Sequence, residues 1–243
     1  MNPFIDIWLY LSASPLLTLT LTLVAYQLAF LLYRKCKYNP LLNPVLVSVT
    51  MLVSILIFTK TSYKTYFDGA QFIHFLLGPA TVALAIPLHA QMPKLRQVYK
   101  PMLVALIFSS FAAALSAVIL AIILGVSRST ILSFAPKSVT TPIAMGIAEH
   151  TGGQASLTAV FVIFTGIIGA IIGPTILNFL KITNPISRGF GMGVASHGVG
   201  TARALQENEV AGAFSALAMG INGAFTAFTL PWLLTLISPW LPK

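Results

Sequence analysis

The chain has 243 residues, a length that fits one or two domains. Hydrophobic residues make up 57% of it and charged residues 8%, whereas a soluble domain carries roughly 25% charged residues. So few charges cannot cover the surface of a soluble globule, and the composition excludes both a soluble enzyme and a disordered protein. A multi-pass membrane protein remains, because a lipid-facing surface needs no charge.

The net charge of +9 comes from Lys and Arg residues that lie in short gaps between apolar runs. Residues that flank membrane segments are placed in this way. No basic stripe with interleaved aromatic residues is present, so no nucleic-acid partner is expected. The single cysteine, Cys36, allows no disulfide within the chain and no cysteine-based metal site. Neither a metal nor a cofactor is expected.

Runs without charged residues mark the expected membrane segments, since a span takes about 20 apolar residues. The first run, residues 7–33, has no basic stretch before it and is longer than the apolar part of a signal peptide, so a retained span is expected. Further long runs lie at residues 39–59, 69–93, 101–127, 150–180 and 210–242. We expect one transmembrane domain over residues 1–243, with a peripheral span at 7–33 and a core at 39–237.

Two segments interrupt this pattern. Residues 129–148 contain Pro136, Lys137 and Pro142, and residues 189–205 are rich in glycine and other small residues. Non-helical backbone at membrane depth survives only where it is buried in protein or lines water. Both segments are therefore expected to be broken or re-entrant helices in an all-α fold of about six to eight membrane segments. Paired interruptions of this kind point to the binding site of a transporter.

A short internal repeat accompanies the interruptions: Pro79-Ala80-Thr81-Val82 resembles Pro136-Lys137-Ser138-Val139. Repeats are common in transporter folds. In addition, small residues recur every fourth position within residues 113–125 and 212–224. This spacing lets helices approach closely in lipid, so these stretches are expected to pack against other helices.

Lys137 lies beside Ser138, Thr140 and Thr141, between two prolines. An ionisable residue in a membrane segment is a functional candidate, because its burial is costly. A helix start offers free N–H groups that favour anions. This cluster is therefore predicted to bind a carboxylate, with Lys137 as the counter-charge. The alternative is a helix cap at the membrane surface, with Lys137 extending to lipid headgroups.

Glu149 and His197 are the candidates for ion coupling. Glu149 could carry a proton or bind a cation, although the glycines that follow it also fit a solvated turn. His197 lies in the glycine-rich segment and would share a helix face with Thr201. Arg203 follows and has the geometry to bind a carboxylate substrate; a local ion pair with Glu207 is the alternative.

Thr81 of the repeat and Asn222 complete the set. Asn222, deep in an apolar run, either lines a cavity or joins two helices by a hydrogen bond. The predicted substrate-binding residues are Thr81, Lys137, Ser138, Thr140, Thr141, His197, Thr201, Arg203 and Asn222, and the predicted ion-coupling residues are Glu149 and His197.

Four motifs, at residues 78–88, 136–144, 149–153 and 196–204, resemble those of the LrgB/CidB family of inner-membrane proteins in the same order. The resemblance implies a multi-pass protein of the bacterial inner membrane that acts with a small LrgA/CidA-type membrane partner, as a homo-oligomer, or both. It implies an antiholin-like modulator of murein hydrolase activity and lysis. Related plant proteins are plastid glycolate/glycerate transporters, and bacterial members are linked to pyruvate uptake.

The expected function is secondary transport of small monocarboxylates such as glycolate, glycerate or pyruvate, coupled to protons or a cation. The alternative is an antiholin-like regulator of murein hydrolase activity and cell lysis that acts with a holin-like partner. No enzyme is expected and no catalytic residue is predicted, because the sequence contains neither HExxH nor GxSxG, nor the GxxxxGK[ST] of an ATP site.

Overall fold

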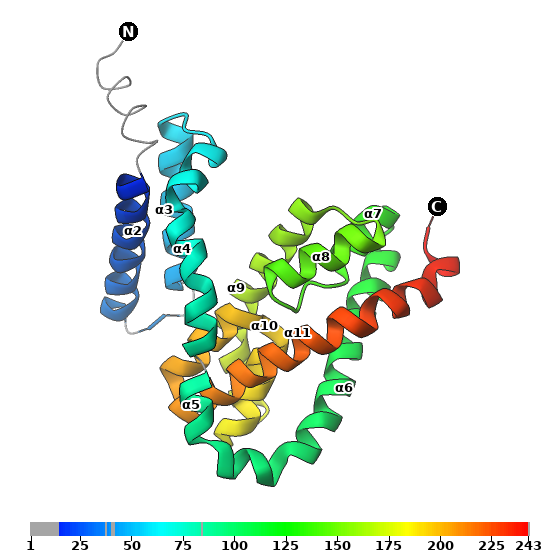
Figure 1. Cartoon of the computed structure of the whole chain (residues 1–243). Helices are drawn as coiled ribbons and strands as arrows, with labels where there is room; N and C mark the ends of the chain where they lie inside the picture. The colour runs from blue at the N-terminus through cyan, green and yellow to red at the C-terminus, as the bar shows by residue number, and fades with distance from the viewer. Residues whose placement is uncertain (1–14, 37, 40–41, 84, 243) are drawn as a thin grey trace, which may run out of the picture. The chain divides into compact units, whose positions relative to one another are not determined.

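The computed structural model describes residues 15–36, 38–39, 42–83 and 85–242, and within them the chain forms helices and no strand. The all-α expectation is therefore confirmed. The elements are α2 (Pro15–Lys35), α3 (Pro44–Phe58), α4 (Tyr63–Ala83), α5 (Ala85–Ala90), α6 (Met92–Ile123), α7 (Arg128–Phe134), α8 (Thr141–Thr151), α9 (Ala155–Phe179), α10 (Pro185–Glu207), α11 (Glu209–Ile237) and the short 3-10 helix η2 (Ser238–Trp240) (Figure 1).

Four helices are long and apolar enough to cross a membrane: α2, α6, α9 and Glu209–Trp240, which joins α11 and η2. Large apolar side chains such as Phe108, Phe179 and Phe228 remain at least 74% exposed on three of them. A surface of this kind faces lipid rather than water, so the chain is a membrane protein. The expected runs at residues 39–59 and 69–93 correspond to α3, a shorter apolar helix, and to α4 with α5. The total of six to eight segments remains a prediction.

Asparagine side chains begin three of the helices. The Oδ1 atoms of Asn43, Asn184 and Asn208 each accept hydrogen bonds from two backbone N–H groups in the first turn of the helix that follows. Asn43 and Asn184 are each followed by proline. Proline is well tolerated at the first helical position, because its missing N–H would have no partner there. The Asn-Pro pairs are therefore start signals for α3 and α10.

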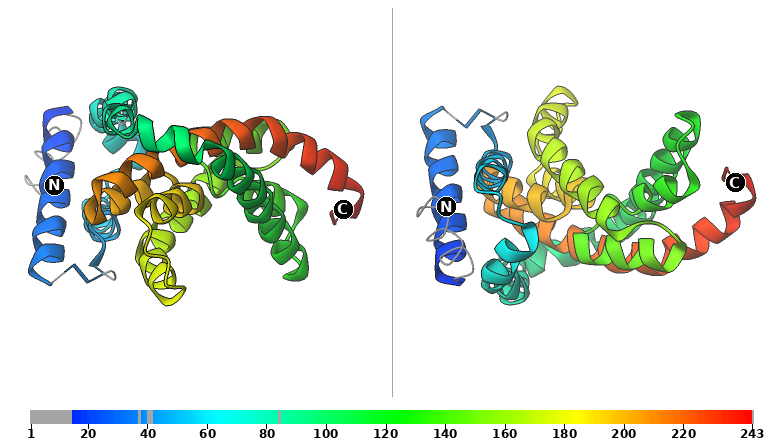
Figure 2. Two further views of the ribbon diagram at one scale, coloured as in Figure 1. Left: turned by 90° about the horizontal axis from the view of Figure 1, so that it is seen from below. Right: turned by 90° about the horizontal axis from the view of Figure 1, so that it is seen from above.

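The chain divides into two compact units, the first of which ends at Ala83. In this first unit α2 packs against α3 and α4 (Figure 2). The hydroxyl groups of Thr22 and Tyr66 lie 2.8 Å apart. Gly69 lets α4 approach α2, because a Cβ at this position would lie 3.1 Å from the Cβ of Thr18. Close packing at a glycine is the usual way in which membrane helices associate.

The second unit assembles around α11. About half of the apolar stretch of α11, 56%, is buried, against 33% or less in the other three long helices. α11 packs against α5, α6, α8 and α10, and α10 also packs against α9 (Figure 1). The apolar core of the second unit includes Ile131, Val139, Val162 and Leu230, which are all nearly inaccessible to solvent. α11 is thus the element that positions the polar residues described below.

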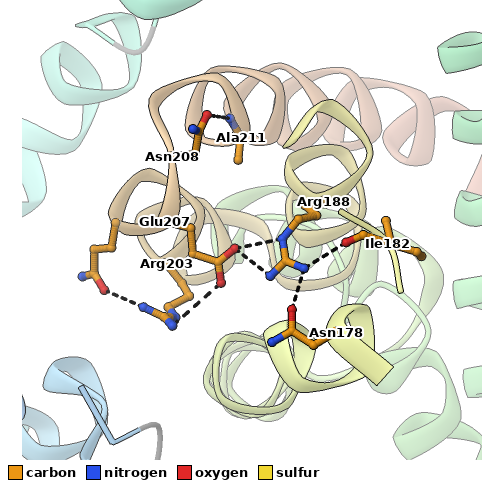
Figure 3. A network of polar contacts seen from close by, with 8 residues as sticks. Asn178, Ile182, Arg188, Arg203, Glu207, Asn208 and Ala211 are labelled. Carbon is orange, nitrogen blue, oxygen red and sulfur yellow. Dashed lines mark hydrogen bonds and ion pairs between the residues drawn. The ribbon is translucent and has the colours of Figure 1, made fainter. Parts of the chain in front are cut away.

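α10 is a helical hairpin, because it reverses at His197, whose φ of 40° and ψ of −129° are non-helical. Arg188 and Glu207 are 19 residues apart and would be separated by about 28 Å along a straight helix. Instead, Nη2 of Arg188 lies 2.9 Å from Oε2 of Glu207 (Figure 3). Residues 185–196 are the first arm of the hairpin and residues 198–207 the second arm. The reversal lies within the segment 189–205, where an interruption was predicted.

Glycines allow the hairpin to fit between α9 and α11. In the first arm, a Cβ at Gly189 would lie 2.7 Å from the carbonyl carbon of Ala211, and one at Gly193 would lie 2.9 Å from that of Ser215. α9 offers three glycines of its own to the hairpin. Gly166 faces His197, Gly169 faces Ser196 and Gly173 faces Met192. The glycines predicted to mark a broken helix therefore also set its distance from α11, and the glycines of α9 set its distance from α9.

Candidate functional site

The interruption predicted in residues 129–148 lies at residues 135–140, between α7 and α8. We call these residues the α7–α8 connection. Ser133 near its start accepts a hydrogen bond from the backbone N–H of Gln154 at 2.7 Å. Gly152, with a φ of 92°, ends α8 in the left-handed conformation that glycine adopts at helix ends. Gly153 then fits against the backbone of Ser133. The two glycines thus tie α7 to the turn after α8.

The α7–α8 connection borders a cavity of about 10 Å³ that α6 and α11 also line. Its polar lining consists of the hydroxyl groups of Ser110, Ser138 and Thr226 and the carboxamide of Asn222. A cavity of this size has room for about one water molecule and offers it enough polar partners. The site is therefore small and uncharged on the α6 and α11 sides.

Asn222 connects three helices at this cavity. Its side chain is 2% exposed. Oδ1 accepts hydrogen bonds from Oγ of Ser110 in α6 and from Oγ1 of Thr226 one turn along α11. Nδ2 donates to the backbone carbonyl of Val194 in the first arm of α10, at 3.4 Å. The two possibilities foreseen for Asn222 thus coincide, because it both lines the cavity and joins helices.

Lys137 lies in the connection and is half-buried. Its Nζ lies 3.4 Å from Oγ of Ser138 and 5.6 Å from the centre of the Phe134 ring. The ion pairs among the described residues join Arg188 and Arg203 to Glu207, and neither involves Lys137. Thr140 precedes the first turn of α8 but makes no side-chain capping bond. A cation and hydroxyl groups therefore accompany a helix start, an arrangement that favours an anion.

His197 lies at the reversal of α10 and is 6% exposed. Its Nε2 is 2.9 Å from the backbone carbonyl oxygen of Val162 in α9. A carbonyl oxygen only accepts, so Nε2 carries the hydrogen. Oγ1 of Thr201 donates to the carbonyl of His197 at 2.8 Å and lies 3.0 Å from Oγ of Ser215. The structure thus brings together the predicted pair of His197 and Thr201.

Arg203 lies beside Glu207 at the base of the hairpin (Figure 3). Its Nη2 lies 3.8 Å from Oε1 of Glu207. Arg188 makes the stronger contact: Nε and Nη2 both donate to Oε2 of Glu207, while Nη1 donates to Oδ1 of Asn178 and to the carbonyl of Ile182. The ion-pair alternative foreseen for Arg203 therefore describes where the structure places it.

Glu149 and Thr141 do not line the cavity. Glu149 is exposed near the C-terminal end of α8, about 12 Å along the helix from Thr141 at its start. Thr141 itself is half-buried. The side chain of Thr81 lies outside the described residues.

Sequence reasoning missed Ser110, Thr226 and Arg188. Serine and threonine in an apolar helix carry no signal, because they often bond to their own backbone. Arg188 carries no sequence signal either, because its partner Glu207 is 19 residues away. Helical pairs are recognised only over three or four residues. The nearest sequence signal to Arg188 is the Asn-Pro helix start that precedes it.

Taken together, long apolar helices, lipid-facing side chains and a buried polar centre define a multi-pass α-helical membrane protein. The LrgB-like family model matches residues 22–236, and the chain belongs to this family. The protein named YwbG of Bacillus subtilis (strain 168) is 34% identical over 220 residues, 90% of this chain and 97% of that protein. The antiholin-like protein LrgB of Bacillus cereus (strain B4264) is 30% identical over 224 residues, 92% of this chain and 97% of that protein. No solved structure matches the chain.

Proposed function

We propose that this chain is an antiholin-like protein of the bacterial inner membrane that regulates murein hydrolase activity and cell lysis. The observation that carries this proposal is the alignment with antiholin-like LrgB over 92% of the chain. The fold is compatible with it, because the second unit buries polar side chains such as Ser110, Ser215 and Asn222 while its long helices keep large apolar side chains exposed. Such faces can contact lipid, a small holin-like membrane partner or a second copy of the chain.

The test is a lysis assay in a bacterium that lacks its own LrgB-type protein but contains a holin-like partner. Cells that produce the wild-type chain are expected to lyse more slowly, and to release less murein hydrolase activity, than cells with an empty vector. Gly191→Ala should behave as wild type and Gly193→Ala should not, because a methyl group has space at Gly191 but not at Gly193. Equal lysis with and without the wild-type chain, when the chain is present in the membrane, would contradict the proposal.

A second candidate function is secondary transport of a small monocarboxylate such as glycolate, glycerate or pyruvate. The specific observation in its favour is Lys137, a half-buried cation that forms no ion pair within the described part of the chain. Ser138, Thr140 and Thr141 lie next to it at the start of α8. One positive charge, several hydroxyl groups and a helix N-terminus suit one carboxylate group.

Transport would also require motion. The cavity of about 10 Å³ beside the α7–α8 connection holds about one water molecule, which is too little for a monocarboxylate. We infer that the connection and the α10 hairpin are re-entrant segments and that the connection shifts to admit the substrate, with His197 or Glu149 carrying the coupled proton or cation. Non-helical backbone at membrane depth is typical of sites of this kind.

A further inference from the structure

The reversal of α10 is strained. His197 has a φ of 40° and a ψ of −129°, a combination that side chains with a Cβ rarely adopt and glycine adopts readily. Glycine follows at the next position, Gly198, yet the unusual conformation falls on the histidine. Strain of this kind persists only where surrounding contacts impose it.

Two contacts hold the His197 ring in place. Nε2 donates to the carbonyl of Val162, at 2.9 Å. The ring also fits closely over Gly166, because a Cβ there would lie 2.6 Å from Cε1 of His197. Both partners belong to α9, so the ring fastens the reversal to that helix. These ring contacts oppose the strain in the backbone of the same residue.

Ser196 adds a second unfavourable feature to this conformation of the reversal. It is 1% exposed, and its Oγ has no hydrogen-bond partner among the described residues. A buried hydroxyl without a partner costs free energy that water would recover. Its neighbour across the interface is Gly169 of α9, whose added Cβ would lie 2.8 Å from the Cβ of Ser196. Withdrawal of the reversal from α9 would let water reach this hydroxyl.

The rest of the hairpin is firmly attached. Val194 before the reversal is bonded through its carbonyl to Asn222, and Thr201 after it contacts Ser215. At the base, Arg188 makes four hydrogen bonds, two of them to Glu207. Motion would therefore be confined to residues 195–200, between the two attached positions.

We propose that residues 195–200 form a latch with two states. In the engaged state the His197 ring contacts Val162 and Gly166 while the backbone is strained. In the released state the ring leaves α9, the backbone relaxes and Ser196 becomes accessible. The base of the hairpin stays fixed in both states. The latch is a conformational device that neither proposed function specifies, and its failure would leave both of them intact.

The test measures the reactivity of a cysteine at Ser196. Cys36, the single native cysteine, is first replaced by serine. Ser196→Cys and, as a buried control, Ala213→Cys (0% exposed) are then made separately in the full-length chain, reconstituted in liposomes, and treated with N-ethylmaleimide. We expect the cysteine at 196 to react at least about tenfold faster than the one at 213, because only the first lies in a segment that opens locally.

Two substitutions at His197 separate a strained latch from an ordinary contact. His197→Ala removes the ring but keeps a Cβ, so strain should drive release and labelling at 196 should rise further. His197→Gly removes ring and strain together, so labelling should be slower than in His197→Ala. Labelling at 213 should stay slow in both. Equal rates in the two variants would show that the strain has no part in release.

Equally slow labelling at positions 196 and 213 in the wild-type background would overturn the latch itself. Hydrogen–deuterium exchange of the chain without introduced cysteines gives a second reading, in case Ser196→Cys disturbs the packing. We expect faster exchange in residues 195–200 than in α11, and a further increase in His197→Ala. Protection as strong in residues 195–200 as in α11, in both proteins, would contradict the proposal.

Discussion

Gly193→Ala is expected to destabilise the second unit, whereas Gly191→Ala, two residues earlier in the same arm, is expected to leave it intact. A Cβ at Gly193 would lie 2.9 Å from both the carbonyl carbon of Ser215 and the Cβ of Ala218, and closer still to the Ser215 oxygen. Backbone atoms cannot rotate away as a flexible side chain can. Overpacking of this kind typically costs about 1–3 kcal/mol.

Gly191→Ala is the matched control because a Cβ there meets nothing within 4 Å. Alanine favours a helix over glycine by about 1 kcal/mol, so this variant should be as stable as wild type or slightly more stable. Thermal unfolding of the purified chain in detergent, followed by circular dichroism, measures the difference. We expect a lower midpoint for Gly193→Ala alone. Unfolding of both variants at the wild-type temperature would contradict the close packing of the hairpin on α11.

If the chain is a carrier, Lys137→Ala is expected to lower carboxylate uptake strongly. A charged hydrogen-bonding group contributes about 1.5–3 kcal/mol, so its loss should lower uptake by at least about tenfold. The assay uses the purified chain in liposomes and labelled glycolate or pyruvate, with and without a pH gradient. Lys181→Ala is the control, because Lys181 is an exposed lysine after α9.

Three outcomes of this experiment are informative. Saturable uptake that Lys137→Ala removes and Lys181→Ala retains would support the proposed carboxylate site. Wild-type uptake by Lys137→Ala would exclude Lys137 from the site. An absence of uptake by well-folded wild-type protein would reject a carrier that works alone and leave the antiholin-like function.

Both interruptions were predictable from sequence, because each depends on local backbone chemistry. Pro136 lies in the connection between α7 and α8 and Pro142 in the first turn of α8, and the glycine-rich stretch around His197 contains the reversal of α10. Membrane location followed from composition alone, since too few charges are present for a water-exposed surface. The sequence singled out His197, Thr201 and Asn222 as candidates, because burial of a polar side chain in an apolar segment costs free energy.

Other features depend on contacts between distant parts of the chain. The pairing of Arg188 with Glu207 exists only because α10 reverses, and the role of Ser110 exists only because α6 meets Asn222 of α11. The run expected at residues 69–93 corresponds to α4 and α5, and the number of membrane segments stays a prediction. For Arg203, the structure shows the ion pair with Glu207 that was foreseen as the alternative to substrate binding.

The hairpin form of α10 determines where His197 lies and brings Arg188 to Glu207, and the latch depends on it. Spin labels at Ser187 and Gln206, both exposed, measure it directly in the chain with Cys36 replaced by serine. A straight helix would separate these positions by about 28 Å. Two packed arms, with axes about 8–10 Å apart, bring them much closer. We expect strong dipolar coupling at a distance well below 28 Å, and a single population near 28 Å would contradict the hairpin.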